Sequence, residues 1–198
     1  MSGFAPEPIA TARLLLLPLG VANAEEMAAV LADPALHTFI GGEPAAPAAL
    51  RARYARLVAG SPDPAEAWCN WVIKLRADGG LAGFVQATVT GFDGPLRHAA
   101  TAGARAVGHR HLDETEPVAA GAVAEIAWVV GMPWQGRGIA TEAARAMAGW
   151  LGRRGVRTLV AHIHPDHHAS AAVAGACGLA PTDVWHDGEI RWTGPAGP

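Results

Sequence analysis

The sequence predicts a single α/β domain in which a mixed, twisted β-sheet is flanked by helices. A chain of 198 residues, 51% of them hydrophobic, is long enough for one domain with a full core. Runs with strand-like and helix-like spacing of apolar residues alternate along it. Residues 124–130 are almost all apolar, as expected of a central strand covered on both faces, and a helix-like run over 140–151 follows.

The first half of the chain is expected to hold one strand, two helices and two further strands. These elements are predicted over residues 13–17, 22–31, 47–58, 68–75 and 81–89. Pro34 ends the first helix, and Pro47 suits the first turn of the second. The segment Ala77-Asp78-Gly79-Gly80 between the last two strands indicates a hairpin.

The second half is expected to hold a strand, a helix, a strand, a short helix and a terminal hairpin. They are predicted over residues 124–130, 140–151, 158–163, 170–176, 184–186 and 189–192. Asp187-Gly188 is typical of a type I′ hairpin turn. The element order is therefore βααβββαβαββ. Five apolar residues share one face of the longer helix: Ile139, Ala143, Met147, Trp150 and Leu151.

The domain is expected to span residues 11–192. The ends over 1–10 and 193–198 are rich in Pro and Gly, and we expect them to be flexible. Residues 91–122 lack periodicity and interrupt the pattern between two strands, so we expect a long disordered loop there.

Composition speaks against several classes of protein. A net charge of −3 without a basic cluster argues against a nucleic-acid partner. No apolar run reaches the roughly 18 residues of a membrane span, and no signal-peptide segment follows Met1, so we expect a cytoplasmic protein. Cys69 and Cys177 lack metal-type spacing, and we expect both to be small buried residues rather than nucleophiles.

The most informative segment is the glycine-containing turn between the strand over 124–130 and the helix that follows. The first N–H groups of a helix have no partner within it, and the helix dipole favours negative charge there. Gly136 and Gly138 let the backbone approach a phosphate without a Cβ in the way. The turn therefore predicts a phosphate-bearing ligand, although an ordinary strand-to-helix turn remains the alternative. Its spacing fits neither G-x-G-x-x-G nor a nucleotide P-loop.

The segment Gln135-x-x-Gly138-x-Ala140 resembles the signature of the GNAT N-acetyltransferase superfamily, whose turn cradles the pyrophosphate of acetyl-CoA. Residues 11–19, 124–129, 165–170 and 177–179 resemble, in the same order, segments of the subgroup that includes ribosomal-protein N-terminal acetyltransferases. His167 stands where this subgroup usually has Asn. The resemblance extends over residues 11–192.

This resemblance implies a GNAT fold and the direct transfer of an acetyl group from acetyl-CoA to a primary amine, without an acyl-enzyme and without a metal. The acceptor would be a protein N-terminus or a small-molecule amine, and a homodimer would fit. The residues expected to bind acetyl-CoA are Val129, Val130, Gly131, Gln135, Gly136, Arg137, Gly138, Ile139, Ala140, Thr141 and His167. The alternatives are a non-catalytic acyl-CoA-binding or regulatory module on this fold, and a nucleotide-binding protein.

Three side chains are candidates for the chemistry. Glu125 precedes Gln135 by ten residues, an offset at which some GNAT enzymes have a catalytic Glu, and Glu189 follows Ser170 at a spacing that resembles the subgroup's Ser…Glu pair. Either carboxylate would take the proton of the amine, but structural pairing of Glu125 and solvation of Glu189 are the alternatives. Ser170 would contact or protonate the leaving sulfur, or cap the short helix.

The histidine-rich segment over residues 162–168 suggests either a metal site or a proton shuttle. Alternation along a strand would put His162 and His164 on one face. No Cys or second carboxylate completes a set of metal ligands, so a proton shuttle is the better supported of the two roles. The histidines at positions 98, 109 and 111 are expected to be solvated.

Overall fold

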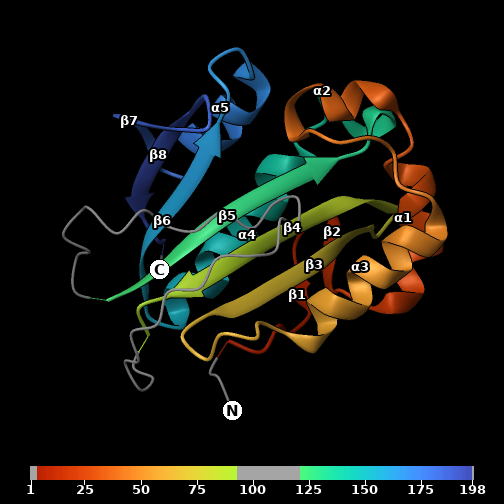
Figure 1. Ribbon diagram of the computed structural model, residues 1–198, viewed down its shortest axis with the longest axis horizontal. Coiled ribbons are helices and arrows are strands. Elements are labelled where there is room, and N and C mark those ends of the chain that lie inside the picture. Colours follow the sequence, from red (N-terminus) through yellow and green to blue (C-terminus); the bar gives the residue numbers. More distant parts are fainter. Residues whose placement is uncertain (1–3, 93–120, 198) are drawn as a thin grey trace.

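The computed structural model describes residues 4–92 and 121–197, whose eight strands form one mixed sheet with helices on both faces (Figure 1). The strand order is β1-β2-β3-β4-β5-β6-β8-β7. Every neighbouring pair is antiparallel except β5 and β6, which run parallel. The strands are β1 (Ile9–Ala10), β2 (Leu14–Pro18), β3 (Ala67–Leu75), β4 (Leu81–Thr90), β5 (Ala122–Val130), β6 (Val156–Ile163), β7 (Ala180–His186) and β8 (Glu189–Pro195).

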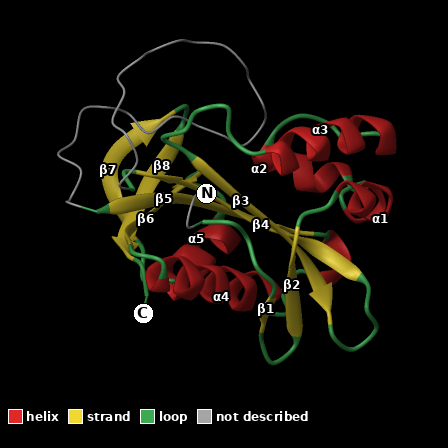
Figure 2. Cartoon of the chain, turned by 90° about the horizontal axis from the view of Figure 1, so that it is seen from below, coloured by secondary structure: helices red, strands yellow, loops and turns green. Residues whose placement is uncertain are grey.

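The helices form a layer on each side of the sheet (Figure 2). One layer holds α4 (Ile139–Arg153) and α5 (His168–Ala176), and the other holds α1 (Ala24–Val30), α2 (His37–Ile40) and α3 (Pro47–Ala59). Short 3₁₀ turns precede three of these helices. Turn η1 (Val21–Asn23) leads into α1, η2 (Pro34–Leu36) leads into α2, and η3 (Met132–Trp134) lies a few residues before α4. The predicted α/β fold with a mixed sheet is confirmed.

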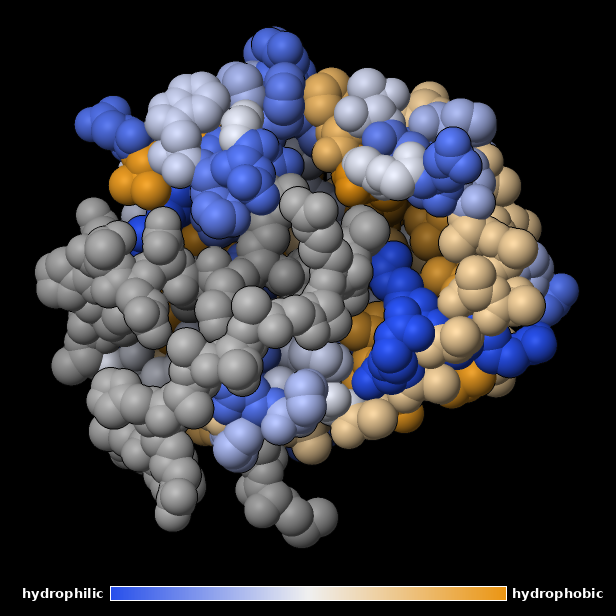
Figure 3. Space-filling model, in the orientation of Figure 1, coloured by the Kyte–Doolittle hydropathy of each residue, from blue (hydrophilic) through white to orange (hydrophobic). Residues whose placement is uncertain are grey.

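The larger core lies between the sheet and α4. All five residues predicted to share a face of this helix are buried there, together with the inward-facing residues of β2 to β6. A smaller cluster around Met27, Leu50 and Tyr54 joins α1 and α3 to the opposite face of the sheet. On the surface of the molecule that carries α1 and α3, hydrophobic and hydrophilic residues are mixed over the described residues (Figure 3). Burial of apolar area in these two layers drives folding of the sheet.

Strands β5 and β6 separate towards their carboxyl ends. Their pairing starts at Ala122 with Val156 and ends at Glu125 with Val160, although β5 continues to Val130 and β6 to Ile163. On its other side β5 stays paired with β4 along its whole length from Val123. The separation therefore leaves the β6-facing edge of Ile126 to Val130 without a paired strand.

Most predicted elements occur with boundaries shifted by a few residues, and two elements were missed. The first is β1, which pairs Ile9 with Leu16, so the sheet begins within the segment expected to be a flexible end. The second is α2, a single turn within the stretch between the first two predicted helices. Strand β8 likewise extends to Pro195. The predicted disordered loop over 91–122 lies almost entirely outside the described residues, as do the histidines at 98, 109 and 111.

Candidate functional site

The predicted strand, turn and helix are confirmed around the glycine-containing segment. Strand β5 ends at Val130, η3 follows, and α4 begins at Ile139 with Gly138 as its N-cap residue. No side chain caps this helix, so the N–H groups of its first turn point away from the helix without a side-chain acceptor. A hydrogen bond across the turn links its end to β5, because Nε2 of Gln135 donates to the Val130 carbonyl at 2.9 Å.

Gly136 and Gly138 both have left-handed backbone conformations, with φ of 69° and 73°. Such angles strain residues that carry a Cβ, so glycine is needed at both positions. A Cβ at Gly136 would meet no atom within 4 Å, and one at Gly138 would meet only Nη2 of Arg13, at 3.4 Å. The turn is therefore open on the side where its backbone donors are exposed, and it can accept an anion there.

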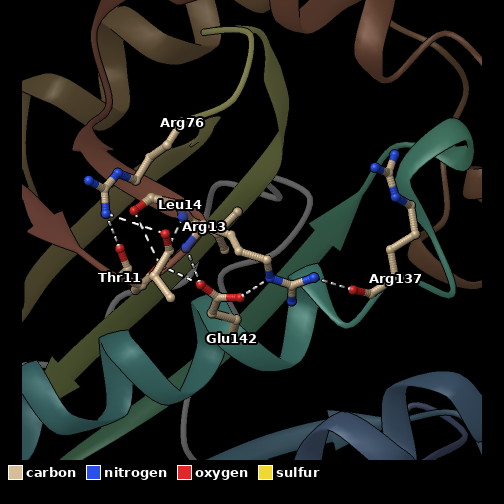
Figure 4. A network of polar contacts seen from close by, with 7 residues as sticks. Thr11, Arg13, Leu14, Arg76, Arg137 and Glu142 are labelled. Carbon is tan, nitrogen blue, oxygen red and sulfur yellow. Dashed lines mark hydrogen bonds and ion pairs between the residues drawn. The ribbon is translucent and has the colours of Figure 1, made fainter.

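A network of polar contacts fastens the start of α4 to the segment before β2 (Figure 4). Glu142, in the first turn of α4, accepts hydrogen bonds from the Thr11 hydroxyl at 2.6 Å and from Nε of Arg13 at 2.6 Å. Its carboxylate also accepts the Arg13 backbone N–H at 2.9 Å. Nη1 of Arg13 donates to the Arg137 carbonyl at 2.9 Å, which ties the network to the turn.

This network sets the charge beside the turn. Partial burial alone would raise the pKa of Glu142, but the hydrogen bonds from Thr11 and Arg13 and the Arg13 charge together lower it. Glu142 is thus ionised, and Arg13 compensates its charge next to the exposed N–H groups. The side chain of Arg137 points away from the network, which leaves its guanidinium available to a ligand (Figure 4).

Neither Arg13 nor Glu142 was predicted as a functional residue. The signal was present, since Thr11 and Arg13 lie in a segment that resembles the first strand of the subgroup. A carboxylate in the first turn of a helix is usually explained by the helix dipole alone. The partners lie 129 residues apart, and only the fold brings them together.

Glu125 lies at the point where β5 and β6 separate, and its carboxylate contacts a histidine. Nδ1 of His162 on β6 lies 3.3 Å from Oε1 of Glu125, and the two side chains are 8% and 13% exposed. Oε2 of Glu125 is buried and has no hydrogen-bond partner among the described residues. The carboxylate thus has a structural partner in His162, one of the histidines suggested as a proton shuttle, and its role as a base stays a prediction.

Ser170 does not cap the short helix. Helix α5 begins at His168, with His167 as its N-cap residue, so Ser170 is the third residue inside the helix and the capping interpretation is wrong. The chain turns at Pro165 and Asp166, so the helix starts two residues before Ser170. Any role of Ser170 towards the sulfur stays a prediction.

The other predicted site residues lie at the carboxyl edge of the parallel pair or near it. Glu189 follows the β7–β8 turn, where Asp187 and Gly188 both have positive φ, as a type I′ turn requires. The His167 ring stacks on Phe39 of α2 with ring centres 4.2 Å apart. Burial, His164 and His168 lower the pKa of His167, which favours its neutral form. The contacts expected of both residues with ligands stay predictions.

Both cysteines are poor nucleophiles. Burial raises the pKa of the Cys69 thiol to about 12 and that of Cys177 to about 11, in each case against the weaker opposite effect of an arginine. Cys69 also donates to the Phe4 carbonyl at 3.1 Å. A thiol with such a pKa is almost never a thiolate at neutral pH, so neither residue is suited to carry an acyl group. Tyr54, the single tyrosine, is a residue of α3 and is buried in the cluster that joins α1 and α3 to the sheet.

Residues 4–92 and 121–197 contain neither a cluster of metal ligands nor a helix suited to a membrane. No group of three or more His, Cys, Asp or Glu side chains there is arranged to hold a metal ion. No helix in this part of the chain is both long enough and apolar enough to span a bilayer.

Comparison with known proteins identifies a family. Residues 13–180 match the acetyltransferase (GNAT) domain. None of the curated proteins matches the chain in sequence.

Solved structures share the fold along almost the whole chain. An acetyltransferase from Agrobacterium tumefaciens is 23% identical with a TM-score of 0.62, and the match covers 98% of this chain and 96% of that one. The ribosomal L7/L12 alpha-N-protein acetyltransferase RimL, solved with coenzyme A, is 16% identical with a TM-score of 0.65 over 94% and 97% of the two chains. The aminoglycoside acetyltransferase AAC(6')-Ib, also solved with coenzyme A, is 14% identical with a TM-score of 0.66 over 92% and 94%.

Proposed function

The chain belongs to the GNAT acetyltransferase family, and on that premise we propose that it transfers the acetyl group of acetyl-CoA to a primary amine. The observation that carries this proposal is that two features of a ligand site follow one another along the chain. An open, uncapped turn suited to phosphate directly follows a strand whose edge is left without a partner. A ligand with a pyrophosphate and an extended, amide-containing arm fits such a combination.

Acetyl-CoA would lie along β5 with its pyrophosphate at the turn. In this placement the backbone N–H groups of Gly136 to Thr141 would bind the phosphates, with the Arg137 guanidinium beside them. The pantetheine arm carries two amide groups, which can pair with the free edge of a strand as an added strand would. The five residues from Ile126 to Val130 offer about 15 Å of such edge. Val129, Val130 and Gly131 lie nearest the turn. We propose His167, the residue before α5, as a further contact of the arm.

The thioester end of an arm laid in this direction would reach the region where β5 and β6 join, and Glu125 lies there. The amine nitrogen attacks the thioester carbonyl carbon, and the carbon–sulfur bond breaks with its electrons passing to sulfur. A base is needed because free amines are mostly protonated at neutral pH. Direct attack is supported by the high pKa values of both cysteines, which leave no acyl-accepting thiolate.

The acceptor is proposed only as a primary amine. Among proteins of this fold, RimL acts on a ribosomal protein N-terminus and AAC(6')-Ib on aminoglycosides, so the fold serves acceptors of very different size. We therefore expect a protein N-terminus or a small-molecule amine.

A screen of amines with acetyl-CoA tests the proposal. Peptides with free N-termini, aminoglycosides, amino acids and polyamines are incubated with the protein, and released thiol and acetylated product are measured. We expect amine-dependent thiol release and a mass increase of one acetyl group on the amine nitrogen. Tight acetyl-CoA binding without transfer to any of these amines would instead identify a non-catalytic acyl-CoA-binding module.

A further inference from the structure

Glu125 and His162 lie side by side on the sheet face opposite α4. Side chains alternate between the faces of β5 and β6, and both Ile126 and Ala161 belong to the core under α4. Glu125 and His162 therefore face the other side of the sheet. Val160 is in register with Glu125, and His162 is the next residue of β6 on that same face.

The contact between the two side chains defines what each ring nitrogen can do. Nδ1 of His162 lies 3.3 Å from Oε1 of Glu125, and the histidine side chain is only 8% exposed. When Nδ1–H donates to the carboxylate, Nε2 is left with a lone pair and becomes the proton acceptor of the ring. The carboxylate then holds the ring in place and stabilises the imidazolium that forms, as in other carboxylate–histidine pairs.

The pair sits at the closed end of the gap between β5 and β6. Pairing of the two strands stops at Glu125 with Val160, so the first unpaired residue of β5 follows Glu125 directly. In the placement proposed above, the arm of acetyl-CoA would end at this point. Oε2 of Glu125 is buried and has no hydrogen-bond partner among the described residues, so it can accept a hydrogen bond from a polar group of a substrate at this place.

A second histidine, His186, lies between the Glu125–His162 pair and solvent. The rings of His162 and His186 have centres 5.6 Å apart, and Nε2 of His186 lies 3.7 Å from Oδ2 of Asp187, whose side chain is 73% exposed. Two charged residues of β8 lie beside these histidines on the same face: Arg191 is in register with His162, and Glu189 is in register with His186. A proton that reaches His162 thus has titratable groups leading outward.

We propose that His162 is the base of the acetyl transfer, with Glu125 as the residue that positions it and His186 as the outlet for the proton. This inference rests on the proposed function. The acceptor ammonium loses two protons in the reaction. One passes to Nε2 of His162, directly or through one water, and leaves by way of His186. The other ends on the sulfur of CoA after the carbon–sulfur bond has broken.

The variant His162→Asn separates proton transfer from structure. The Asn amide occupies the position of Nδ1–H and still donates to Glu125, but it cannot accept a proton. We expect kcat to fall by about 10²- to 10⁴-fold at neutral pH, with unchanged acetyl-CoA affinity and melting temperature. The control Arg51→Asn removes a surface side chain that pairs with Glu25 at 3.2 Å, and we expect wild-type rates.

The pH profile of Glu125→Gln distinguishes this inference from one in which Glu125 itself is the base. If His162 is the base, the glutamine variant keeps a rise of kcat with pH, because the imidazole that accepts the proton is still present. If Glu125 is the base, that rise disappears in Glu125→Gln and persists in His162→Asn. A folded His162→Asn protein with wild-type kcat and pH profile overturns the inference and leaves the proposed acetyl transfer intact.

Discussion

At the scale of single residues, Gly136 is the position where backbone geometry and ligand binding can be separated. Its φ of 69° strains any side chain, but a Cβ there would meet no protein atom within 4 Å. Gly178, after α5, has the same properties, with φ of 84° and open space around it. The two glycines therefore carry a similar conformational cost and differ in that only Gly136 lies in the proposed phosphate site.

We predict that Gly136→Ala weakens acetyl-CoA binding by about tenfold or more, equivalent to about 1.4 kcal/mol, because the methyl group occupies the approach of the phosphate. Both Gly136→Ala and Gly178→Ala should lose about 1–2 kcal/mol of stability from the left-handed conformation. Calorimetric titration with acetyl-CoA, together with thermal melts, measures both effects. Equal affinities in the two variants would mean that the pyrophosphate does not bind at this turn.

At the scale of elements, the β5–turn–α4 unit could be predicted because its signals are local. The apolar strand, the two glycines and the apolar face of the helix all lie within about thirty residues of sequence. The contact that anchors this unit to β2 could not be predicted, because Arg13 and Glu142 meet only once β2 lies beside α4. The Glu125–His162 contact likewise depends on the register of the parallel pair, which no hairpin turn fixes.

The short helix shows a different limit of local reasoning. Serine is a favoured N-cap residue, and this preference placed the start of α5 at Ser170. The helix instead begins at His168, after the turn at Pro165 and Asp166 and the N-cap residue His167, and it has no side-chain cap hydrogen bond. Helix starts set by the packing of a preceding strand need not coincide with the best local cap.

The Arg13–Glu142 contact predicts an electrostatic effect on acetyl-CoA binding. Removing the guanidinium in Arg13→Ala leaves the charge of Glu142 uncompensated in the first turn of α4, where it repels the phosphates. We expect acetyl-CoA affinity to fall about three- to tenfold at low salt, and less at high salt, since screening weakens exposed charges. Titrations at two salt concentrations measure this change.

A double variant provides the internal test of that explanation. Arg13→Ala combined with Glu142→Gln removes both charges, and we expect it to recover much of the affinity lost in Arg13→Ala. Arg51→Ala is the matched control, because Arg51 pairs with Glu25 at 3.2 Å between α3 and α1, away from the turn. A double variant that binds as weakly as Arg13→Ala would show that the network acts through geometry of the turn and not through charge.

At the scale of the whole molecule, the proposed ligand would join parts of the sheet that otherwise separate. Strands β5 and β6 diverge after Glu125, and among the described strands β6, β8 and β7 are joined to the rest of the sheet by the short parallel pairing of β5 with β6. A ligand that occupies the gap along β5 adds contacts in the folded state alone. It should therefore stabilise the protein against unfolding in proportion to its affinity.

Thermal melts with a series of ligands test whether the turn and the strand edge form one site. At a concentration about 100-fold above Kd, a ligand adds about 2.7 kcal/mol, which raises the Tm of a domain of this size by about 5–10 °C. We expect acetyl-CoA and CoA to reach such a shift. ADP, which offers a pyrophosphate without the arm, and pantetheine, which offers the arm without the pyrophosphate, should each give a much smaller one. A shift with ATP equal to that with acetyl-CoA would mean that the strand edge contributes nothing and that the turn serves a nucleotide instead.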